Sequence, residues 1–222
     1  MFPSQNKRQE DIEHQANEIG KIAIIVLAAG SSSRLGQPKQ LVEIEHQSLI
    51  YRQCQLASTL TPHVYCVIGC QALQMRSALS ELEVNVVENI AWSDGMGSSI
   101  SAAISQLPVH IEAAMIVLVD QWKLTQADLN LLVKQHINSP QMIIQSRQVN
   151  RQEKKANGPP VIFPKRFFTN LIGLKGEQGA KPIVEKFKSS TLMVDIPNAF
   201  EDIDTPEQLA KVTMFLSKMK KD

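Results

Sequence analysis

The sequence of 222 residues has few cysteines, almost no net charge and no long apolar run, and each shortage excludes a class of protein. Three cysteines, Cys54, Cys66 and Cys70, are too few for a disulfide framework, so we expect a reducing, cytoplasmic location. Lysine and arginine (23 residues) nearly cancel aspartate and glutamate (22 residues), so no overall field attracts nucleic acid. No apolar stretch approaches the ~20 residues that span a bilayer. The composition thus predicts neither nucleic-acid nor membrane partners.

The chain has enough apolar residues, 43%, to fill a substantial core. Residues 1–20 are polar and mixed in charge, and we interpret them as an N-terminal extension. Residues 21–222 are expected to form a single domain.

Short β-rich runs alternate with segments of helical periodicity from residue 21 onward. The pattern predicts strands at 22–27, 64–69, 84–88, 113–119, 142–145, 159–164 and 192–196, and helices at 49–60, 72–82, 98–107, 125–136 and 205–218. This order indicates an α/β fold, a three-layer, Rossmann-like, mainly parallel sheet with helices on both faces. Segment 147–158 lacks an apolar anchor and is predicted to be a loop, with a short antiparallel excursion near 145–163.

The loop that follows the first predicted strand, LAAGSSSRLGQPK at 27–39, begins with small residues and then presents two cations, Arg34 and Lys39. Ligands of open α/β sheets bind beyond the carboxyl ends of the strands. The small residues let a ligand approach the backbone, and successive N–H groups can bind an anion. The segment matches neither the P-loop nor the G-x-G-x-x-G pattern. It suits a triphosphate, although an ordinary loop with two surface cations would use the same residue types.

The segment LAAGSSSRLGQPKQL resembles the signature loop of nucleotidyltransferases of the MobA-like superfamily, most closely that of the molybdenum cofactor cytidylyltransferases. Further segments agree in order with family motifs: ENIAWSDGMGSSI at 88–100, VDQ at 119–121, GPPVIFP at 158–164, GEQGAK at 176–181 and DIDTPE at 202–207. The likeness spans roughly residues 21 to 215. It implies a nucleotide-diphospho-sugar transferase-like fold, with residues 21–222 as the nucleotidyltransferase domain.

The resemblance also implies residue roles at the nucleotide. Nucleotide-binding candidates are Leu27, Ala28, Ala29, Gly30, Ser31, Arg34, Lys39, Gly95, Gly97, Ser98 and Ser99. Of these, Arg34 and Lys39 would be catalytic, because they offset charge on the α-phosphate and the departing pyrophosphate. The glycines of GMGSS would permit close approach to a flat base, whose edge Ser98 or Ser99 could recognise. Ala29 favours CTP, since cytidylyl members tend to carry Ala-Ala-Gly there and guanylyl members Ala-Gly-Gly.

Three aspartates are candidates for binding Mg²⁺, which prefers carboxylate oxygens. Asp120 ends a buried strand, and Asp202 and Asp204 share one face of an extended segment. By resemblance, one of the latter two approaches the same ion. We favour Asp202, because Asp204 directly precedes Thr-Pro-Glu and could instead cap the last helix.

The acceptor side is predicted to involve Gln121, Trp122, Gly158 and Lys181. The sequence departs from the family pattern here, with Trp122 in place of proline and Glu177 in place of aspartate. Trp122 could stack on a pterin or cover the edge of the core.

The leading interpretation is a Mg²⁺-dependent transfer of CMP from CTP to the phosphorylated pterin of the molybdenum cofactor, with a molybdoenzyme receiving the product. The alternatives are guanylyl transfer to the same cofactor, cytidylyl transfer to another small phosphate, and a non-catalytic protein that delivers cofactor. GMGSS and GEQGAK argue against a methylerythritol phosphate acceptor. The joint presence of Arg34, Lys39, Asp120 and Asp202 argues against the non-catalytic protein, which has no need of clustered charges.

Overall fold

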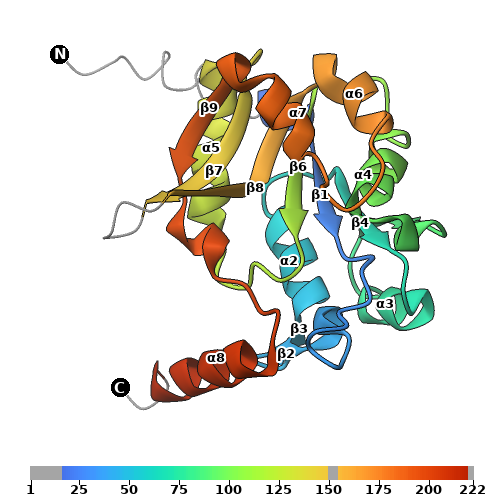
Figure 1. Ribbon diagram of the computed structural model, residues 1–222, viewed down its shortest axis with the longest axis vertical. Helices are drawn as coiled ribbons and strands as arrows, with labels where there is room; N and C mark the ends of the chain where they lie inside the picture. Colours follow the sequence, from blue (N-terminus) through green and yellow to red (C-terminus); the bar gives the residue numbers. More distant parts are fainter. Residues whose placement is uncertain (1–16, 150–154, 220–222) are drawn as a thin grey trace.

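The computed structural model describes residues 17–149 and 155–219, and its centre is a seven-stranded sheet (Figure 1). The strands lie in the order β5-β4-β1-β6-β8-β7-β9. Their bounds are β1 Ile22–Leu27, β4 Val64–Ile68, β5 Asn85–Glu88, β6 Ala113–Leu118, β7 Ile143–Val149, β8 Lys155–Pro164 and β9 Thr191–Asp195. Every neighbouring pair is parallel except the two that involve β8. The predicted mainly parallel sheet is confirmed, as is the antiparallel excursion.

Helices cover both faces of this sheet, because alternate residues of each central strand point to opposite sides. Ile24 and Val26 of β1 belong to one core and Ile25 to the other. The first core is closed by α2 (Leu49–Ser58), α3 (Ala72–Ala78), α5 (Gln126–Asn138) and α8 (Pro206–Met219). The second is closed by α4 (Met96–Ile104), α6 (Phe168–Ile172) and α7 (Lys181–Lys186). The three-layer α/β prediction is therefore confirmed.

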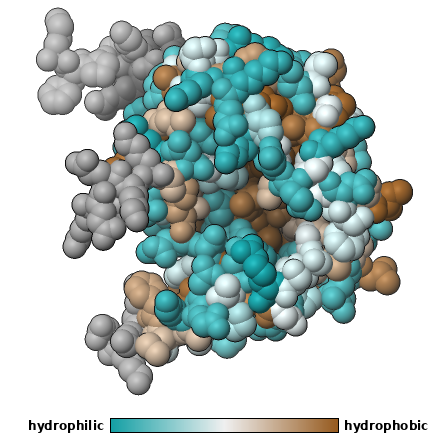
Figure 2. All heavy atoms as spheres, viewed as in Figure 1, coloured by the Kyte–Doolittle hydropathy of each residue, from teal (hydrophilic) through white to brown (hydrophobic). Residues whose placement is uncertain are grey.

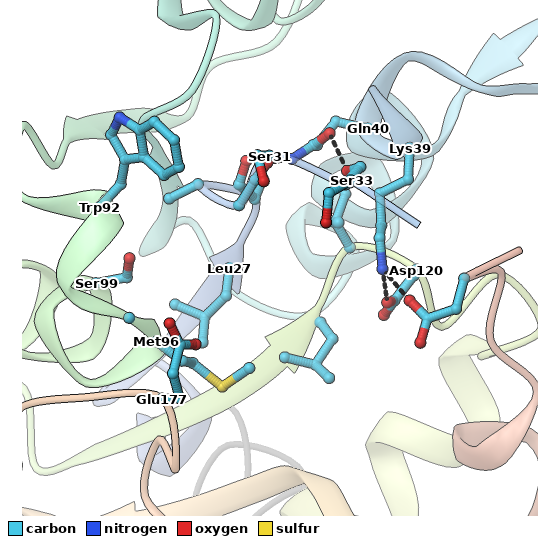
Figure 3. A pocket seen from close by; sticks show the side chains of 18 of the residues that line it. Leu27, Ser31, Ser33, Lys39, Gln40, Trp92, Met96, Ser99, Asp120 and Glu177 are labelled. Carbon is cyan, nitrogen blue, oxygen red and sulfur yellow. Dashed lines mark hydrogen bonds and ion pairs between the residues drawn. The ribbon is translucent and has the colours of Figure 1, made fainter. Parts of the chain in front are cut away.

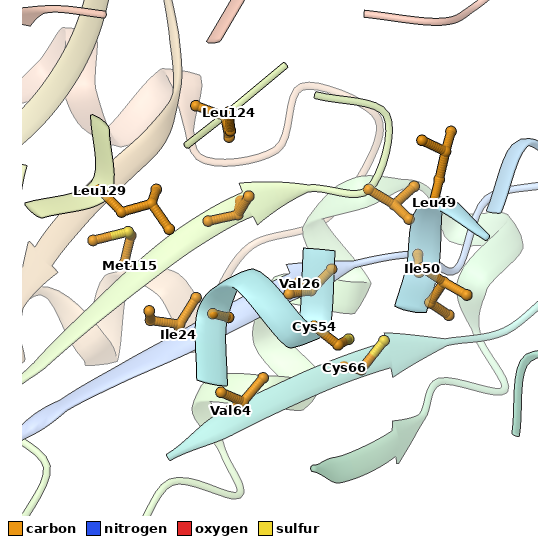
Figure 4. Close-up of a cluster of buried hydrophobic side chains, with 14 of the residues drawn as sticks. Ile24, Val26, Leu49, Ile50, Cys54, Val64, Cys66, Met115, Leu124 and Leu129 are labelled. Atoms are coloured by element: carbon orange, nitrogen blue, oxygen red, sulfur yellow. The ribbon is translucent and has the colours of Figure 1, made fainter. Parts of the chain in front are cut away.

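The first core packs helix α2 against strands β1 and β4. Figure 4 shows Leu49, Ile50 and Cys54 of α2 lying over the strand residues Val26 and Cys66. Hydrogen bonding to Cys54, together with burial, raises the pKa of the Cys66 thiol, so Cys66 is a neutral core residue, and Cys54 is buried beside it.

The prediction of a loop at 147–158 is wrong for its described residues. Strand β7 runs to Val149 and β8 begins at Lys155, and the two pair in an antiparallel ladder from Ser146 opposite Gly158 to Val149 opposite Lys155. These strand ends are polar because they extend beyond the core, and backbone pairing holds them instead of apolar burial. Sequence periodicity does not detect such strands.

Element boundaries elsewhere differ from the predictions by a few residues. The capping arrangement expected at the start of α5 is present: the Asp128 N–H donates to Thr125 Oγ1 (3.2 Å) and the Thr125 N–H donates to Asp128 Oδ2 (2.9 Å). The sequence did not predict α6, α7 or the small hairpin of β2 (Glu43–Ile44) and β3 (Gln47–Ser48). Residues 1–16 of the expected N-terminal extension lie outside the described residues. None of the helices within the described ranges is long and apolar enough to cross a membrane.

Candidate active site

The carboxyl ends of β1 and β6 open into a cavity of about 480 Å³, which we call the first cavity. In the view of Figure 2, which is that of Figure 1, the surface has a hollow near its centre, with apolar side chains at the floor of the hollow. Its walls come from segments far apart in the chain: 27–34 and 39–40, 92–93, 95–96 with Ser99, 118–120, Glu177 and Asp204. Leu27, Ala28, Ala29, Gly30 and Ser31, all predicted to bind nucleotide, line it. The topology, with parallel strands ending at one edge, creates this position.

The loop after β1 is held in shape by a glutamine that the sequence analysis did not single out. Gln40 is buried, and its Nε2 donates to the carbonyl oxygens of Ala28 (2.9 Å) and Gly30 (2.7 Å). Its Oε1 accepts from Ser32 Oγ (3.1 Å). The backbone of Ser32 has a positive φ of 57°. Because its amide satisfies carbonyls of the loop, Gln40 positions the backbone around the cavity. Nothing in the local sequence pattern identified it.

Two cations and two carboxylates meet on one wall of the first cavity. Lys39 Nζ donates to Asp120 Oδ2 (2.7 Å) and also to Asp204 Oδ1 (Figure 3). Arg34 Nη2 donates to Asp204 Oδ2 (2.8 Å) from a side chain that is 73% exposed. The structure thus brings together Arg34 and Lys39, predicted from one loop, with Asp120 and Asp204 from distant segments.

The electrostatics of this wall favour a further cation. Burial raises the pKa of Asp120 above its ordinary value, and the attraction of Lys39 offsets this only partly. Burial alone would lower the pKa of Lys39, but its ion pairs with Asp120 and Asp204 raise it. Asp120 Oδ1 is buried without a hydrogen-bond partner among the described residues. An unpaired carboxylate oxygen is costly to bury, so Asp120 is suited to bind a cation through it.

Asp204, and not the favoured Asp202, lies on the first cavity. The Asp202 carboxylate is directed toward α8, where its Oδ1 accepts from Gln208 Nε2 (3.0 Å). The suggestion that Asp204 caps this helix is wrong, because Thr205 Oγ1 accepts from the Gln208 N–H (3.3 Å). Gln208 Oε1 in turn accepts from the Thr205 N–H (2.9 Å), which completes a capping box. The Asp204 side chain is thereby left to pair with Lys39 and Arg34.

The glycines of GMGSS adjoin protein backbone, which gives each of them a structural reason besides the expected approach of a flat base. A Cβ on Gly95 would lie 2.5 Å from the carbonyl carbon of Gly176, and one on Gly97 would lie 2.9 Å from backbone atoms of Lys175. The Gly97 N–H donates to the Gly176 carbonyl (2.9 Å). These glycines therefore seat the 175–177 loop. Gly95 also lines the first cavity, whereas Gly97 does not.

The two serines of this motif differ in position. Ser98 Oγ lies at the carbonyl oxygens of Ala91 (2.9 Å) and Gly95 (2.8 Å), to which it can donate, and it accepts from Asn89 Nδ2 (2.8 Å). It is absent from the cavity lining. Ser99 lines the first cavity and accepts from Asn89 Nδ2 (3.0 Å). Of the two, only Ser99 is placed to contact a base.

The four acceptor candidates separate into two pairs. Gln121 is buried, and its Nε2 donates to the carbonyl oxygens of Pro159 and Ala199, each at 2.7 Å, so it joins the end of β6 to β8. Trp122 packs edge-on against Phe215 of α8, with ring centroids 6.3 Å apart. Both residues are structural in these contacts, and the acceptor role predicted for Gln121 and the stacking role considered for Trp122 are not supported by this geometry.

Gly158 and Lys181, in contrast, line a second cavity of about 390 Å³. This second cavity shares two wall residues, Met96 and Leu118, with the first. A ligand in one is therefore next to a ligand in the other.

A small-residue loop at the carboxyl edge of a parallel sheet, with two cations opposite two carboxylates, is the arrangement of an enzyme that binds a nucleoside triphosphate. The model of the MobA-like NTP transferase domain matches residues 24–191. The chain belongs to this family and is a nucleotidyltransferase.

Two curated proteins are similar to most of the chain. The purine catabolism protein PucB of Bacillus subtilis is 25% identical over 206 residues, covering 87% of this chain and 96% of that protein. Nicotine blue oxidoreductase of Paenarthrobacter nicotinovorans is 26% identical over 196 residues, covering 85% and 94%.

Solved structures share the nucleotide-diphospho-sugar transferase-like fold. The 4-diphosphocytidyl-2C-methyl-D-erythritol synthase of Anaerococcus prevotii superposes with a TM-score of 0.74 at 12% identity, covering 92% of this chain and 99% of that one. The molybdopterin-guanine dinucleotide biosynthesis protein A of Archaeoglobus fulgidus gives 0.65 at 16% identity, with 88% and 99% coverage. The Mycobacterium tuberculosis protein Rv0371c in complex with manganese gives 0.63 at 22% identity, with 86% and 97% coverage.

Proposed function

We propose that this nucleotidyltransferase transfers CMP from CTP to the phosphate of molybdopterin, with Mg²⁺ as its metal ion. The observation that carries the proposal is the first cavity, where the small-residue loop after β1 lies beside Lys39, Asp120 and Asp204, next to a second, more apolar cavity. A phosphate oxygen of the acceptor attacks the α-phosphorus of CTP and forms a new P–O bond. The bond between the α- and β-phosphates breaks, and pyrophosphate leaves.

Lys39 and Arg34 bind the triphosphate and offset the charge that grows on the leaving pyrophosphate. Arg34 is exposed and its ion pair with Asp204 contributes little, so the guanidinium is available to a phosphate. Lys39 exchanges its carboxylate partners for phosphate oxygens when CTP binds. Gln40 keeps the loop carbonyls turned away from the phosphates, so that N–H groups face the anion.

Asp120 and Asp204 would hold the Mg²⁺ ion, which when bound neutralises negative charge on the reacting phosphates. The described residues contain no group of three or more metal-ligating side chains. Two carboxylates nevertheless suffice, because Mg²⁺ in such sites takes its other oxygens from the substrate phosphates and water. The unpaired Oδ1 of Asp120 supports this assignment, as does the manganese complex of the mycobacterial protein of the same fold.

The preference for CTP rests on the alanine pair at the start of the loop. Ala29 is 5% exposed, and with Ala28 it lines the first cavity. A methyl group at this position leaves less space for a purine than a glycine would. The molybdopterin acceptor is supported by the archaeal protein of the same fold, named for molybdopterin-guanine dinucleotide synthesis. A cytoplasmic location and a molybdoenzyme that receives the product follow from the same proposal.

A matrix of the four nucleoside triphosphates against molybdopterin tests this function, with pyrophosphate release as the measurement. Release should require Mg²⁺ and the acceptor, and it should be faster with CTP than with GTP. Equal rates with both would refute the base assignment.

Two matched variants test the metal site in the same assay. Asp204→Asn should lower turnover about 100-fold, whereas Asp202→Asn, whose carboxylate accepts from Gln208 and does not line the first cavity, should retain near wild-type turnover. The opposite ranking would return Asp202 to the metal.

A further inference from the structure

One row of side chains forms part of the second cavity, and it crosses four neighbouring strands. Ile116 of β6 is paired with Val161 of β8, Val161 with Gln145 of β7, and Gln145 with Met193 of β9. Paired residues on adjacent strands point to the same face of the sheet. All four residues line the second cavity, so the row is a continuous surface with an apolar side chain at every position but one.

The exception is Gln145, which carries a primary amide, whereas the other three residues of the row are apolar. The residue as a whole is 7% exposed, its side chain lines the second cavity, and no side-chain hydrogen bond of Gln145 is found among the described residues. The register of β7 and β8 shifts directly after Gln145, an irregularity that often re-aims a side chain beside an active site. Gln145 is not among the residues whose polar side-chain atoms are fully buried and unpartnered, so its amide is open to the second cavity and available to a ligand there.

The remaining walls define what that ligand is like. Phe163, Ile100 and Val184 add apolar surface, and the cations Lys181 and Lys188 also line the cavity. The volume of about 390 Å³ lies in the range of roughly 300–1,000 Å³ usual for small-molecule sites. The sheet floor of the cavity is apolar apart from the Gln145 amide, and Asn157, Gln178 and Glu185 add polar groups to its walls. Such a slot fits a flat heterocycle that carries donors and acceptors on its edge.

We propose that the second cavity holds the pterin ring of the acceptor and that Gln145 determines specificity for it, which rests on the proposed function. Gln145 Oε1 accepts from an N–H of the ring, and Nε2 donates to the ring carbonyl oxygen. Because the two cavities share Met96 and Leu118, a ring seated here leaves its phosphate next to the nucleotide in the first cavity. Gln145 would thus be the residue that distinguishes a pterin from an acceptor without a heterocycle.

Binding of neopterin, a fluorescent pterin without the phosphate, tests the proposal in the absence of nucleotide. Wild type should bind it, and Gln145→Leu should weaken binding about tenfold, which corresponds to about 1.4 kcal/mol. Gln145→Asn, which keeps the amide, should recover part of the loss. Gln74→Leu, at an exposed glutamine of α3, is the matched control and should bind as wild type does. Equal affinity in wild type and Gln145→Leu, or no neopterin binding to wild type, would overturn the proposal.

Steady-state kinetics of the same variants separates this inference from the proposed function. Gln145→Leu should raise the KM for molybdopterin about tenfold and leave the KM for CTP unchanged, which also shows that the variant is folded. If neopterin binding depends on Gln145 but no CMP is transferred, the cavity assignment stands and the proposed function fails. If CMP transfer to molybdopterin proceeds with an unchanged KM in Gln145→Leu, the function stands and the role of Gln145 is refuted.

Discussion

The ion pair between Lys39 and Asp120 makes a stability prediction that is independent of catalysis. In Lys39→Met, Asp120 would keep a charge in a buried place with no other cation paired to it in the described structure, whereas Asp204 would keep its partner Arg34. The free energy of unfolding should therefore fall mainly through Asp120. The loss should shrink as the pH is lowered toward 3.8, because burial raises the pKa of Asp120 and protonation removes the uncompensated charge.

The size of the expected loss in the free energy of unfolding follows from how exposed the side chains of Lys39 and Asp120 are. Removing one partner of a fully buried pair costs about 3–5 kcal/mol, and an exposed pair contributes about 0.2–1 kcal/mol. The side chains of Lys39 and Asp120 are 17% and 12% exposed, and both line a cavity. We therefore expect a loss near 2 kcal/mol, roughly 4–8 °C in Tm for a chain of this size.

Urea unfolding of wild type, Lys39→Met, Asp120→Asn and the double variant measures this coupling as a double-mutant cycle. The double variant should be more stable than Lys39→Met alone, because the amide carries no charge. A coupling below about 0.5 kcal/mol would show that water screens the pair, and the account of a buried charged wall would be refuted.

Three further predictions test other contacts. Gln40→Leu removes the hydrogen bonds that hold the loop after β1, at about 1 kcal/mol each, and should raise the KM for CTP at least about tenfold; an unchanged KM would contradict its positioning role. Gly97→Ala places a Cβ 2.9 Å from the backbone of Lys175 and should cost about 1–3 kcal/mol in thermal unfolding. Gly173→Ala, whose Cβ would meet its nearest neighbour at 3.6 Å, is the control, and equal losses in both would rule out the close contact as the cause. Burial lowers the pKa of His136 from 6.5, so the unfolded state binds a proton more readily and wild type should lose stability as the pH falls below 6.5. His136→Leu should flatten that dependence in urea unfolding at pH 5.5 and 7.5, and parallel pH profiles would refute the assignment.

Features of local origin were the ones that could be predicted from the sequence. The runs at 22–27 and 113–119 are apolar at every position, and they form β1 (Ile22–Leu27) and β6 (Ala113–Leu118), which are covered on two faces. Thr125 and Asp128 stand three residues apart and form the expected cap. Arg34 and Lys39 follow β1 within one loop, so their place at the carboxyl edge of the sheet was also predictable.

Features that depend on contacts between distant segments were decided by the tertiary structure. The choice between Asp202 and Asp204 depended on Gln208 and on the position of Lys39, and the glycines of GMGSS are explained by the 175–177 loop. The position of Gln145 in the second cavity follows from its pairing with Val161 of β8 and Met193 of β9, which the local sequence does not predict. The sequence by itself determined the layers, the position of the loop after β1 and the family, since each depends on residues that are close together in the chain. Packing decided that Asp204 lines the first cavity and that Gln145 lines the second. The direction of each side chain depends on partners that lie tens of residues away in the chain.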